Sequence, residues 1–142
     1  MILVDTNVIS ELWKPRPNAS VLAWMDAQPI EALYLSAITV AELRFGLATM
    51  PKGRRQSIFQ DRLEQEILPA LKGRVLAFDL DTSHAYSVLM ARAQSEGKSI
   101  SKADGYIAAT ARPRALKVAT RDVAPFQAAG LTVINPWDFE VE

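Results

Sequence analysis

The sequence contains no cysteine, which excludes disulfide bonds and thiolate-ligated zinc sites. Its single histidine, His84, excludes ribonucleases that pair a histidine acid with a histidine base, so any hydrolysis has to depend on carboxylates and a metal. No apolar run approaches the ~20 residues of a membrane span. The N-terminus also lacks the basic start and long apolar stretch of a signal peptide. Together these absences predict a cytoplasmic protein.

Neither sign of charge dominates, because 16 basic residues balance 16 acidic ones. The chain as a whole therefore has no electrostatic attraction to nucleic acid, and any such attraction must come from local patches. A chain of 142 residues is expected to form one domain, residues 1–142, whose single core buries ~68–70% of the unfolded surface.

Short apolar runs alternate with helical segments along the whole chain. The expected strands are Ile2–Val4, Leu33–Leu35, Arg74–Phe78, Leu116–Thr120 and Leu131–Ile134. The expected helices are Val8–Leu12, Ala19–Gln28, one from Ser36 or Thr39 to Met50, Gln56–Leu71, one from Asp81 or Thr82 to Gly97, one from Ser101 to Pro113, and Val123–Ala129. This alternation predicts a three-layer α/β/α sandwich with a mainly parallel sheet of about five strands.

The N-terminal run Ile2–Val4 leads directly into Asp5. An uninterrupted apolar run is typical of a strand covered on both faces. Asp5 then lies at the carboxyl end of that strand, where open α/β sheets bind their ligands. Thr6 and Asn7 follow at once, with a hydroxyl and an amide that can hold the carboxylate. We therefore interpret Asp5 as the first ligand of a metal site.

Three further acids lie at comparable places in the predicted fold. Glu42 is early in the helix after the second strand, on a stripe with Ile38 and Phe45 that we expect to face the core. Asp104 is in the first turn of its helix, and Asp122 lies two residues past the fourth strand. Because strand carboxyl ends and helix amino ends share one edge of a parallel sheet, the four carboxylates are expected to converge there.

Convergence of like charges needs a counter-charge, because clustered carboxylates repel one another in a low dielectric. Oxygen ligands without histidine or cysteine favour a hard ion, Mg²⁺ or Mn²⁺. Such an ion activates water and stabilises in-line displacement at a phosphodiester. The acidic residues therefore predict metal-dependent phosphodiester hydrolysis.

Each acid also has a purely structural interpretation. Thr39–Glu42 fits a capping box, and Ser101–Asp104 resembles one with aspartate as its third member. Asp5 and Asp122 are each placed to cap the helix that follows. Singly these interpretations compete with the metal site, but jointly they do not explain why all four acids gather at one edge. Glutamine at position 42 would satisfy a capping box and lose the ligand charge, so activity in Glu42→Gln distinguishes the two.

Four segments, in order, resemble a PIN-domain protein: VDTNVIS at Val4–Ser10, LSAITVAELRFGL at Leu35–Leu47, ADGYIAATA at Ala103–Ala111 and ATRD at Ala119–Asp122. Within that family the chain is most similar to VapC toxins of the FitB-like branch, which carry the same DTNVIS opening and NPW ending. The resemblance covers essentially the whole chain.

The resemblance implies a Mg²⁺- or Mn²⁺-dependent ribonuclease toxin that cuts RNA, often tRNA. The family's acidic quartet corresponds to Asp5, Glu42, Asp104 and Asp122, and its supporting hydroxyl and amide positions to Thr6, Asn7 and Thr120. Family members are silenced by a VapB- or FitA-like antitoxin that occludes the acidic pocket. They usually form homodimers, and the complex binds promoter DNA through the antitoxin.

Basic residues supply candidates for RNA binding. Arg121 neighbours Asp122, and Lys52, Arg54 and Arg55 form the densest basic run. The basic run is suited to following an RNA backbone, although a solvated helix end is the commoner meaning of such runs. Arg121 is placed to meet a phosphate, although an exposed, solubilising arginine is the commoner case.

Other functions have to be weighed against a toxin nuclease. A haloacid-dehalogenase-type phosphotransferase needs a second aspartate where this chain has Asn7, and Lys117 is poorly placed as its lysine. The remaining alternatives are a housekeeping RNA-processing PIN nuclease and a catalytically silent PIN module whose acidic pocket receives a partner's arginine. Four clustered carboxylates argue against the silent module, because a retired site has no physical need for them.

Overall fold

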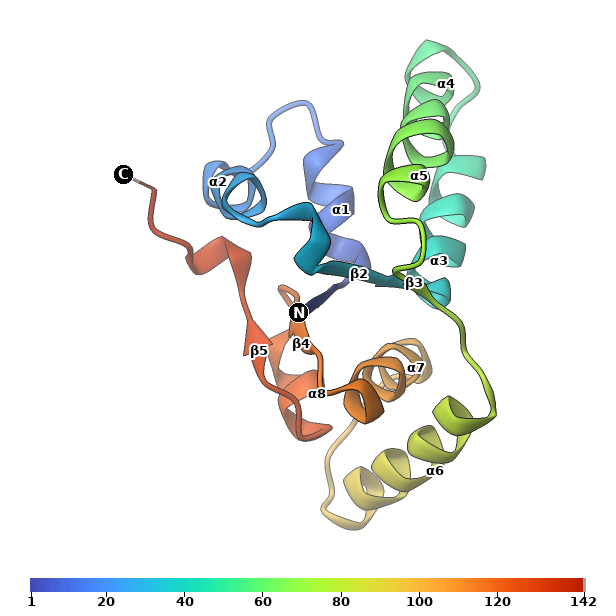
Figure 1. The fold of residues 1–142 in the computed structure, drawn as a ribbon, viewed down its shortest axis with the longest axis vertical. Helices are drawn as coiled ribbons and strands as arrows, with labels where there is room; N and C mark the ends of the chain where they lie inside the picture. Colours follow the sequence, from blue (N-terminus) through green and yellow to red (C-terminus); the bar gives the residue numbers. More distant parts are fainter. Residues whose placement is uncertain (142) are drawn as a thin grey trace.

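The computed structural model describes residues 1–141 and contains a five-stranded, fully parallel sheet in the order β3-β2-β1-β4-β5 (Figure 1). The strands are β1 Ile2–Val4, β2 Leu33–Ser36, β3 Val75–Leu76, β4 Lys117–Ala119 and β5 Val133–Ile134. The α-helices are α1 Thr6–Leu12, α2 Ala19–Ala27, α3 Ala37–Ala48, α4 Arg54–Asp61, α5 Leu68–Ala70, α6 Leu80–Ser95, α7 Lys102–Ala111 and α8 Val123–Ala128. The predicted fold class is confirmed.

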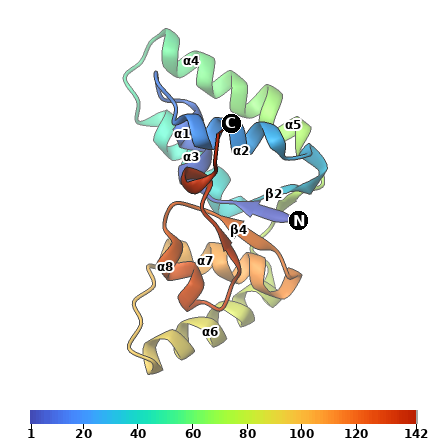
Figure 2. The same cartoon turned by 90° about the vertical axis from the view of Figure 1, so that its left-hand side faces the viewer.

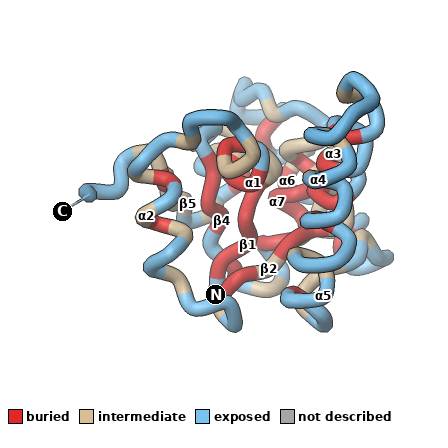
Figure 3. The backbone as a smooth tube through the Cα atoms, turned by 90° about the horizontal axis from the view of Figure 1, so that it is seen from above, coloured by how far each residue is buried: buried red, intermediate tan, exposed pale blue. Residues whose placement is uncertain are grey.

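Helices cover both faces of the sheet. Figure 2 shows α1 to α5 on one side and α6 to α8 on the other. Each side has its own hydrophobic core, and β1 contributes to both because successive strand residues point to opposite faces. Ile2 and Val4 belong to the core under α1, α2 and α3, whereas Leu3 belongs to the core under α6, α7 and α8. In Figure 3 the buried backbone accordingly runs through the central strands, and the outer helices are largely exposed.

The predicted segments are found in place, with differences at their ends. The third strand is shorter than the predicted Arg74–Phe78, because only Val75 and Leu76 pair with β2. The predicted helix Gln56–Leu71 consists of α4, a π-helical stretch at Arg62–Ile67, and α5. The α6 helix is capped by Asp79, not by Asp81 or Thr82, since Asp79 accepts a hydrogen bond from the backbone N–H of Thr82 at 2.8 Å.

The core-facing stripe predicted for α3 is confirmed at Ile38, which packs against one core, and is wrong at Phe45. Phe45 is 70% exposed, and the buried positions of this helix are Thr39, Val40, Leu43 and Leu47. The segment is apolar on several sides, so periodicity alone did not identify its buried face. Glu42 is half-buried.

No helix in the described part of the chain is both long and apolar enough to span a membrane.

Candidate active site

The candidate site lies where the strand order reverses beside β1. The chain adds β2 and β3 on one side of β1, and later β4 and β5 on the other. In such sheets the connections that leave the two adjacent strands go to opposite faces of the sheet, which leaves a crevice for ligands outside the carboxyl ends of the strands. Val4 pairs with Ala119, and the backbone N–H of Asp5 donates to the carbonyl of Ala119 at 2.9 Å. Asp5 and Thr120 therefore emerge side by side at this crevice.

All four predicted acids line a single cavity of about 360 Å³ at this edge. Their side chains come from the end of β1, the second turn of α3, the first turn of α7 and the segment before α8. The complete lining is Asp5, Thr6, Asn7, Ser10, Glu11, Lys14, Glu42, Asp104, Arg121, Asp122 and Trp137. The structure thus brings together four acids that are separated by up to 117 positions in the chain.

Thr120 holds Asp5 in place from behind the cavity. It is fully buried, and its hydroxyl donates to Asp5 Oδ2 at 2.8 Å. Thr120 Oγ1 also accepts hydrogen bonds, from the Asn7 amide at 3.3 Å and from the backbone N–H of Asp122 at 3.0 Å. A hydroxyl has two lone pairs and one proton, so both acceptor sites are filled and the proton is left for Asp5. The other Asp5 oxygen, Oδ1, accepts from the backbone N–H of Thr6 at 2.8 Å.

The acids influence one another's protonation. Burial raises the pKa of Asp5 from 3.8 to about 6, and the carboxylates of Asp104 and Glu42 add to the rise, while the hydrogen bonds from Thr120 and Thr6 oppose it. Burial also raises the pKa of Asp104, with further contributions from Asp122 and Glu42. The four carboxylates therefore form one electrostatic group, and a cation in the cavity would relieve their repulsion.

Glu42 is a cavity residue and not part of a capping box. The N-cap of α3 is Ser36, whose hydroxyl accepts from the backbone N–H of Thr39 at 2.9 Å. The interpretation of Thr39–Glu42 as a capping box is therefore wrong. Glu42 instead accepts a hydrogen bond from the hydroxyl of Thr6 at 2.6 Å, which connects α3 to the end of β1.

Of the other capping interpretations, one is wrong and two are confirmed in part. Asp122 precedes α8, but its side chain makes no capping hydrogen bond, so that interpretation is wrong. Asp5 does cap α1 through Thr6, and Ser101 caps α7 by accepting from the backbone N–H of Asp104 at 3.2 Å. Capping explains part of the position of Asp5 and Asp104, and does not explain Glu42 or Asp122.

The donor set suits a hard divalent cation, because every titratable group of the predicted quartet is a carboxylate. Within residues 1–141, however, no three acidic or histidine side chains are close enough to form a preformed metal cage. The carboxylates line an open cavity instead. This arrangement fits an ion such as Mg²⁺, which keeps several of its waters and takes few protein ligands.

Sequence reasoning missed four residues of the cavity: Ser10, Glu11, Lys14 and Trp137. The first three follow Asn7 at helical spacing along α1 and just past its end, so their shared face was visible in the sequence. Glu11 is only 5% exposed, and it accepts from the backbone N–H of Asn18 at 3.0 Å and from Lys14 Nζ at 2.8 Å. The hydrogen bond from Lys14 holds the pKa of Glu11 below its usual range.

The predicted substrate-binding arginines occupy different places. Arg121 lines the acidic cavity, and its guanidinium lies 5.2 Å from the centre of the Trp137 ring. Arg55 lines a neighbouring cavity, and Arg54 is exposed at the start of α4 and lines neither of the two. Lys117 is exposed at the amino end of β4, opposite the site, which agrees with setting the phosphotransferase aside.

Comparisons with known proteins agree with this architecture. The PIN domain family model matches residues 2–130. The chain is 69% identical to the VapC ribonuclease Y4jK of Sinorhizobium fredii over 138 residues, which is 97% of this chain and 99% of that protein. It is 52% identical to toxin FitB of Neisseria gonorrhoeae over 137 residues, or 96% and 99% of the two chains.

A solved structure of FitAB bound to a DNA fragment superposes with a TM-score of 0.95 at 49% identity, covering 99% of both chains. The parallel sheet, the acidic cavity at its edge and these matches along nearly the whole chain lead to one assignment: this protein belongs to the PIN-domain family.

Proposed function

We propose that this chain is a Mg²⁺- or Mn²⁺-dependent endoribonuclease and the toxin of a type II toxin–antitoxin pair. One observation carries the proposal: Asp5, Glu42, Asp104 and Asp122, from four distant parts of the chain, line one cavity. The raised pKa values of Asp5 and Asp104 support it further, because burial, and to a smaller extent the neighbouring carboxylates, disfavour their charged forms, and a cation would offset that cost. The 69% identity to a VapC ribonuclease supports RNA as the substrate.

In this proposal carboxylates of the cavity would hold the divalent ion, partly through its waters, and the ion would supply Lewis-acid activation of water and neutralise charge on the phosphodiester. Thr120 and the backbone N–H of Thr6 hold both oxygens of Asp5, so its carboxylate keeps one orientation toward the cavity. The hydroxyl of Thr6 donates to one oxygen of Glu42 and so restrains that carboxylate. Arg121 and Lys14 are the two cations in the cavity wall, and they are suited to contact an RNA phosphate.

We further propose that a VapB- or FitA-like antitoxin inhibits this chain by filling the acidic cavity. The relative named toxin FitB and the FitAB structure with bound DNA support a partner of this kind and an assembly on promoter DNA. Homodimer formation belongs to the same proposal. An acidic cavity is complementary to a cationic side chain, so an arginine of the antitoxin is the group expected to enter it.

The test uses purified protein and a labelled single-stranded RNA. We expect endonucleolytic products with Mg²⁺ or Mn²⁺, none after chelation with EDTA, and recovery when the metal is restored in excess. Asp104→Asn should abolish cleavage, because it removes one carboxylate from the cavity. Asp26→Asn is the matched control, since Asp26 is exposed on α2 and does not line the cavity. Cleavage that continues in EDTA, or that survives Asp104→Asn, would overturn the proposal.

A further inference from the structure

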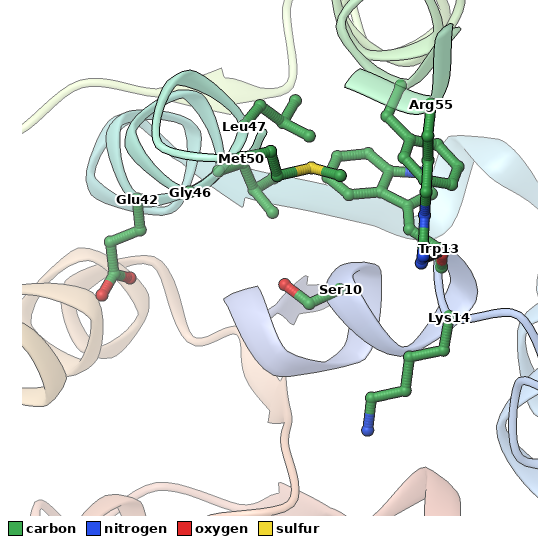
Figure 4. A pocket seen from close by; sticks show the side chains of 10 residues that line it. Ser10, Trp13, Lys14, Glu42, Gly46, Leu47, Met50 and Arg55 are labelled. Carbon is green, nitrogen blue, oxygen red and sulfur yellow. Dashed lines mark hydrogen bonds between the residues drawn. The ribbon is translucent and has the colours of Figure 1, made fainter. Parts of the chain in front are cut away.

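A second cavity, of about 240 Å³, lies beside the acidic one between α1, α3 and α4 (Figure 4). Its wall is mostly apolar and is formed by Trp13, Leu43, Gly46, Leu47, Met50 and Phe59. Ser10, Lys14 and Glu42 line both cavities, so the two lie directly side by side. A polymer bound at the carboxylates would therefore have this apolar cavity within reach of its next unit.

The aromatic part of this wall is held rigidly. The rings of Trp13 and Phe59 stack with their centres 5.6 Å apart and their planes at 23°. Arg55 donates to the carbonyl of Trp13 at 3.1 Å and lies 5.4 Å from the centre of the Phe59 ring. In Figure 4 the Met50 thioether extends toward the Trp13 indole. A flat, polarisable surface is thus already in place before any ligand binds.

Cations accompany the apolar wall. Arg55 and Lys14 both line the cavity, and Lys14 is held by the buried carboxylate of Glu11 at 2.8 Å. Glu42, which this cavity shares with the acidic one, is the one carboxylate among the described residues of the lining, so Arg55 and Lys14 are the groups that would attract an anionic polymer with flat apolar groups. Single-stranded nucleic acid has this chemistry, because its bases stack on aromatic side chains while its phosphates contact cations.

Gly46 is an independent indication that something approaches this wall. It lies inside α3, where glycine is unfavourable relative to alanine. Its backbone is not left-handed, and a Cβ built on it would meet no atom within 4 Å, so nothing within the described structure requires glycine here. A ligand that packs directly against the helix backbone at this point would require it.

We propose that this cavity is a nucleobase subsite, which holds the base of a nucleotide next to the scissile phosphate. The inference rests on the proposed ribonuclease function and extends it to the way RNA is held. The base packs between the Trp13 side of the wall and the backbone at Gly46, while Lys14 contacts the adjoining phosphate. The acidic cavity then receives the phosphodiester that is cut.

The test compares binding of a single-stranded RNA octamer with binding of an abasic ribose–phosphate octamer, by fluorescence anisotropy in EDTA so that no strand is cut. We expect the native protein to prefer the RNA by about tenfold, as stacking of a base implies. Gly46→Leu fills the cavity and should remove this preference. Ala48→Leu is the matched control on the exposed face of the same helix, and it should keep the preference.

A second measurement needs no variant. RNA containing 5-bromouridine is irradiated with the native protein, and the cross-linked peptide is identified by mass spectrometry. Cross-links at Trp13 or Phe59 support the subsite, whereas cross-links only at other residues overturn it. The subsite is also overturned if Gly46→Leu prefers the RNA octamer over the abasic octamer as strongly as the native protein does. It is overturned as well if Gly46→Leu binds and cuts RNA normally but is no longer inhibited by the antitoxin. The ribonuclease proposal is tested separately: it fails if the native protein shows no metal-dependent cleavage of RNA.

Discussion

Thr120 and Asp5 lie side by side at the ends of adjacent strands, and the hydroxyl of Thr120 donates to Asp5 Oδ2 at 2.8 Å. Because the same hydroxyl oxygen already accepts from Asn7 and from the backbone of Asp122, its proton has only Asp5 to go to. One buried threonine therefore sets the orientation of the central carboxylate and the position of the Asp122 segment together.

Thr120→Val should remove this donor while keeping the shape of the side chain. Since the hydrogen bond lowers the pKa of Asp5, its loss should raise that pKa above about 6 and move the acidic limb of the pH–rate profile to higher pH. We expect activity to fall by about 10- to 100-fold, as for other groups that orient metal ligands. Thr120→Ser keeps the hydroxyl and should retain the native profile. An unchanged profile in Thr120→Val would show that the contact does not tune Asp5.

The stability of the metal-free protein should depend on pH through Asp5. The pKa of this carboxyl is raised in the folded state to about 6, so its favourable contribution to folding is complete below the ordinary value of 3.8 and is lost as the pH rises through 6. A shift of about two units corresponds to ~3 kcal/mol. Asn does not titrate, so Asp5→Asn should gain about that much free energy of unfolding relative to the native chain between about pH 4 and pH 8.

Urea denaturation in EDTA at several pH values measures this difference. The comparison of the two chains cancels the titration of groups that do not interact with Asp5, and the quantity of interest is how the difference in unfolding free energy changes with pH. A difference in unfolding free energy that stays constant across this range would contradict the assignment of a raised pKa to Asp5. Excess Mg²⁺ or Mn²⁺ should reduce the pH dependence, because bound metal favours the ionised carboxylate.

Glu42→Gln should inactivate the proposed nuclease without unfolding it. Glutamine still accepts a hydrogen bond from Thr6 and leaves the cap of α3 at Ser36 intact, but it removes one charge from the cavity. We expect cleavage to fall at least about 100-fold and the thermal stabilisation by Mn²⁺ to decrease, because a ligand charge is lost. Glu31→Gln, an exposed glutamate outside the cavity, is the control. Full activity in Glu42→Gln would remove this residue from the catalytic group.

Ser36→Ala tests the cap that replaces the predicted Thr39–Glu42 box. The serine is fully buried, accepts from the backbone N–H of Thr39, and donates to the Thr39 hydroxyl at 3.1 Å. Its removal should lower the free energy of unfolding by about 1–2 kcal/mol. Chemical denaturation measures the change, with Ser57→Ala on the exposed face of α4 as the control. A loss no larger than that of the control would mean that the cap is not needed for stability.

The order of strands and helices follows from local patterns in the chain. The run Ile2–Val4 is apolar without interruption because β1 is covered on both faces, and the N-cap at Ser101 was visible from the side chains alone. The acids of the cavity were also recognisable, because each stands at a strand end or early in a helix. The buried face of α3 was not, since an apolar segment without a clear polar side has no distinctive period.

Local patterning was enough to define an α/β fold and to mark four acids as candidates for one site, because hydrophobic period, caps and strand ends depend on neighbouring residues. Three features became visible only in the tertiary structure. They are the hydroxyl of Thr120 between Asp5 and Asp122, the absence of a capping hydrogen bond at Glu42, and the aromatic cavity beside the acids. Those features depend on contacts between segments far apart in the chain, such as the 115-residue separation between Asp5 and Thr120, and no local pattern encodes which side chains meet there.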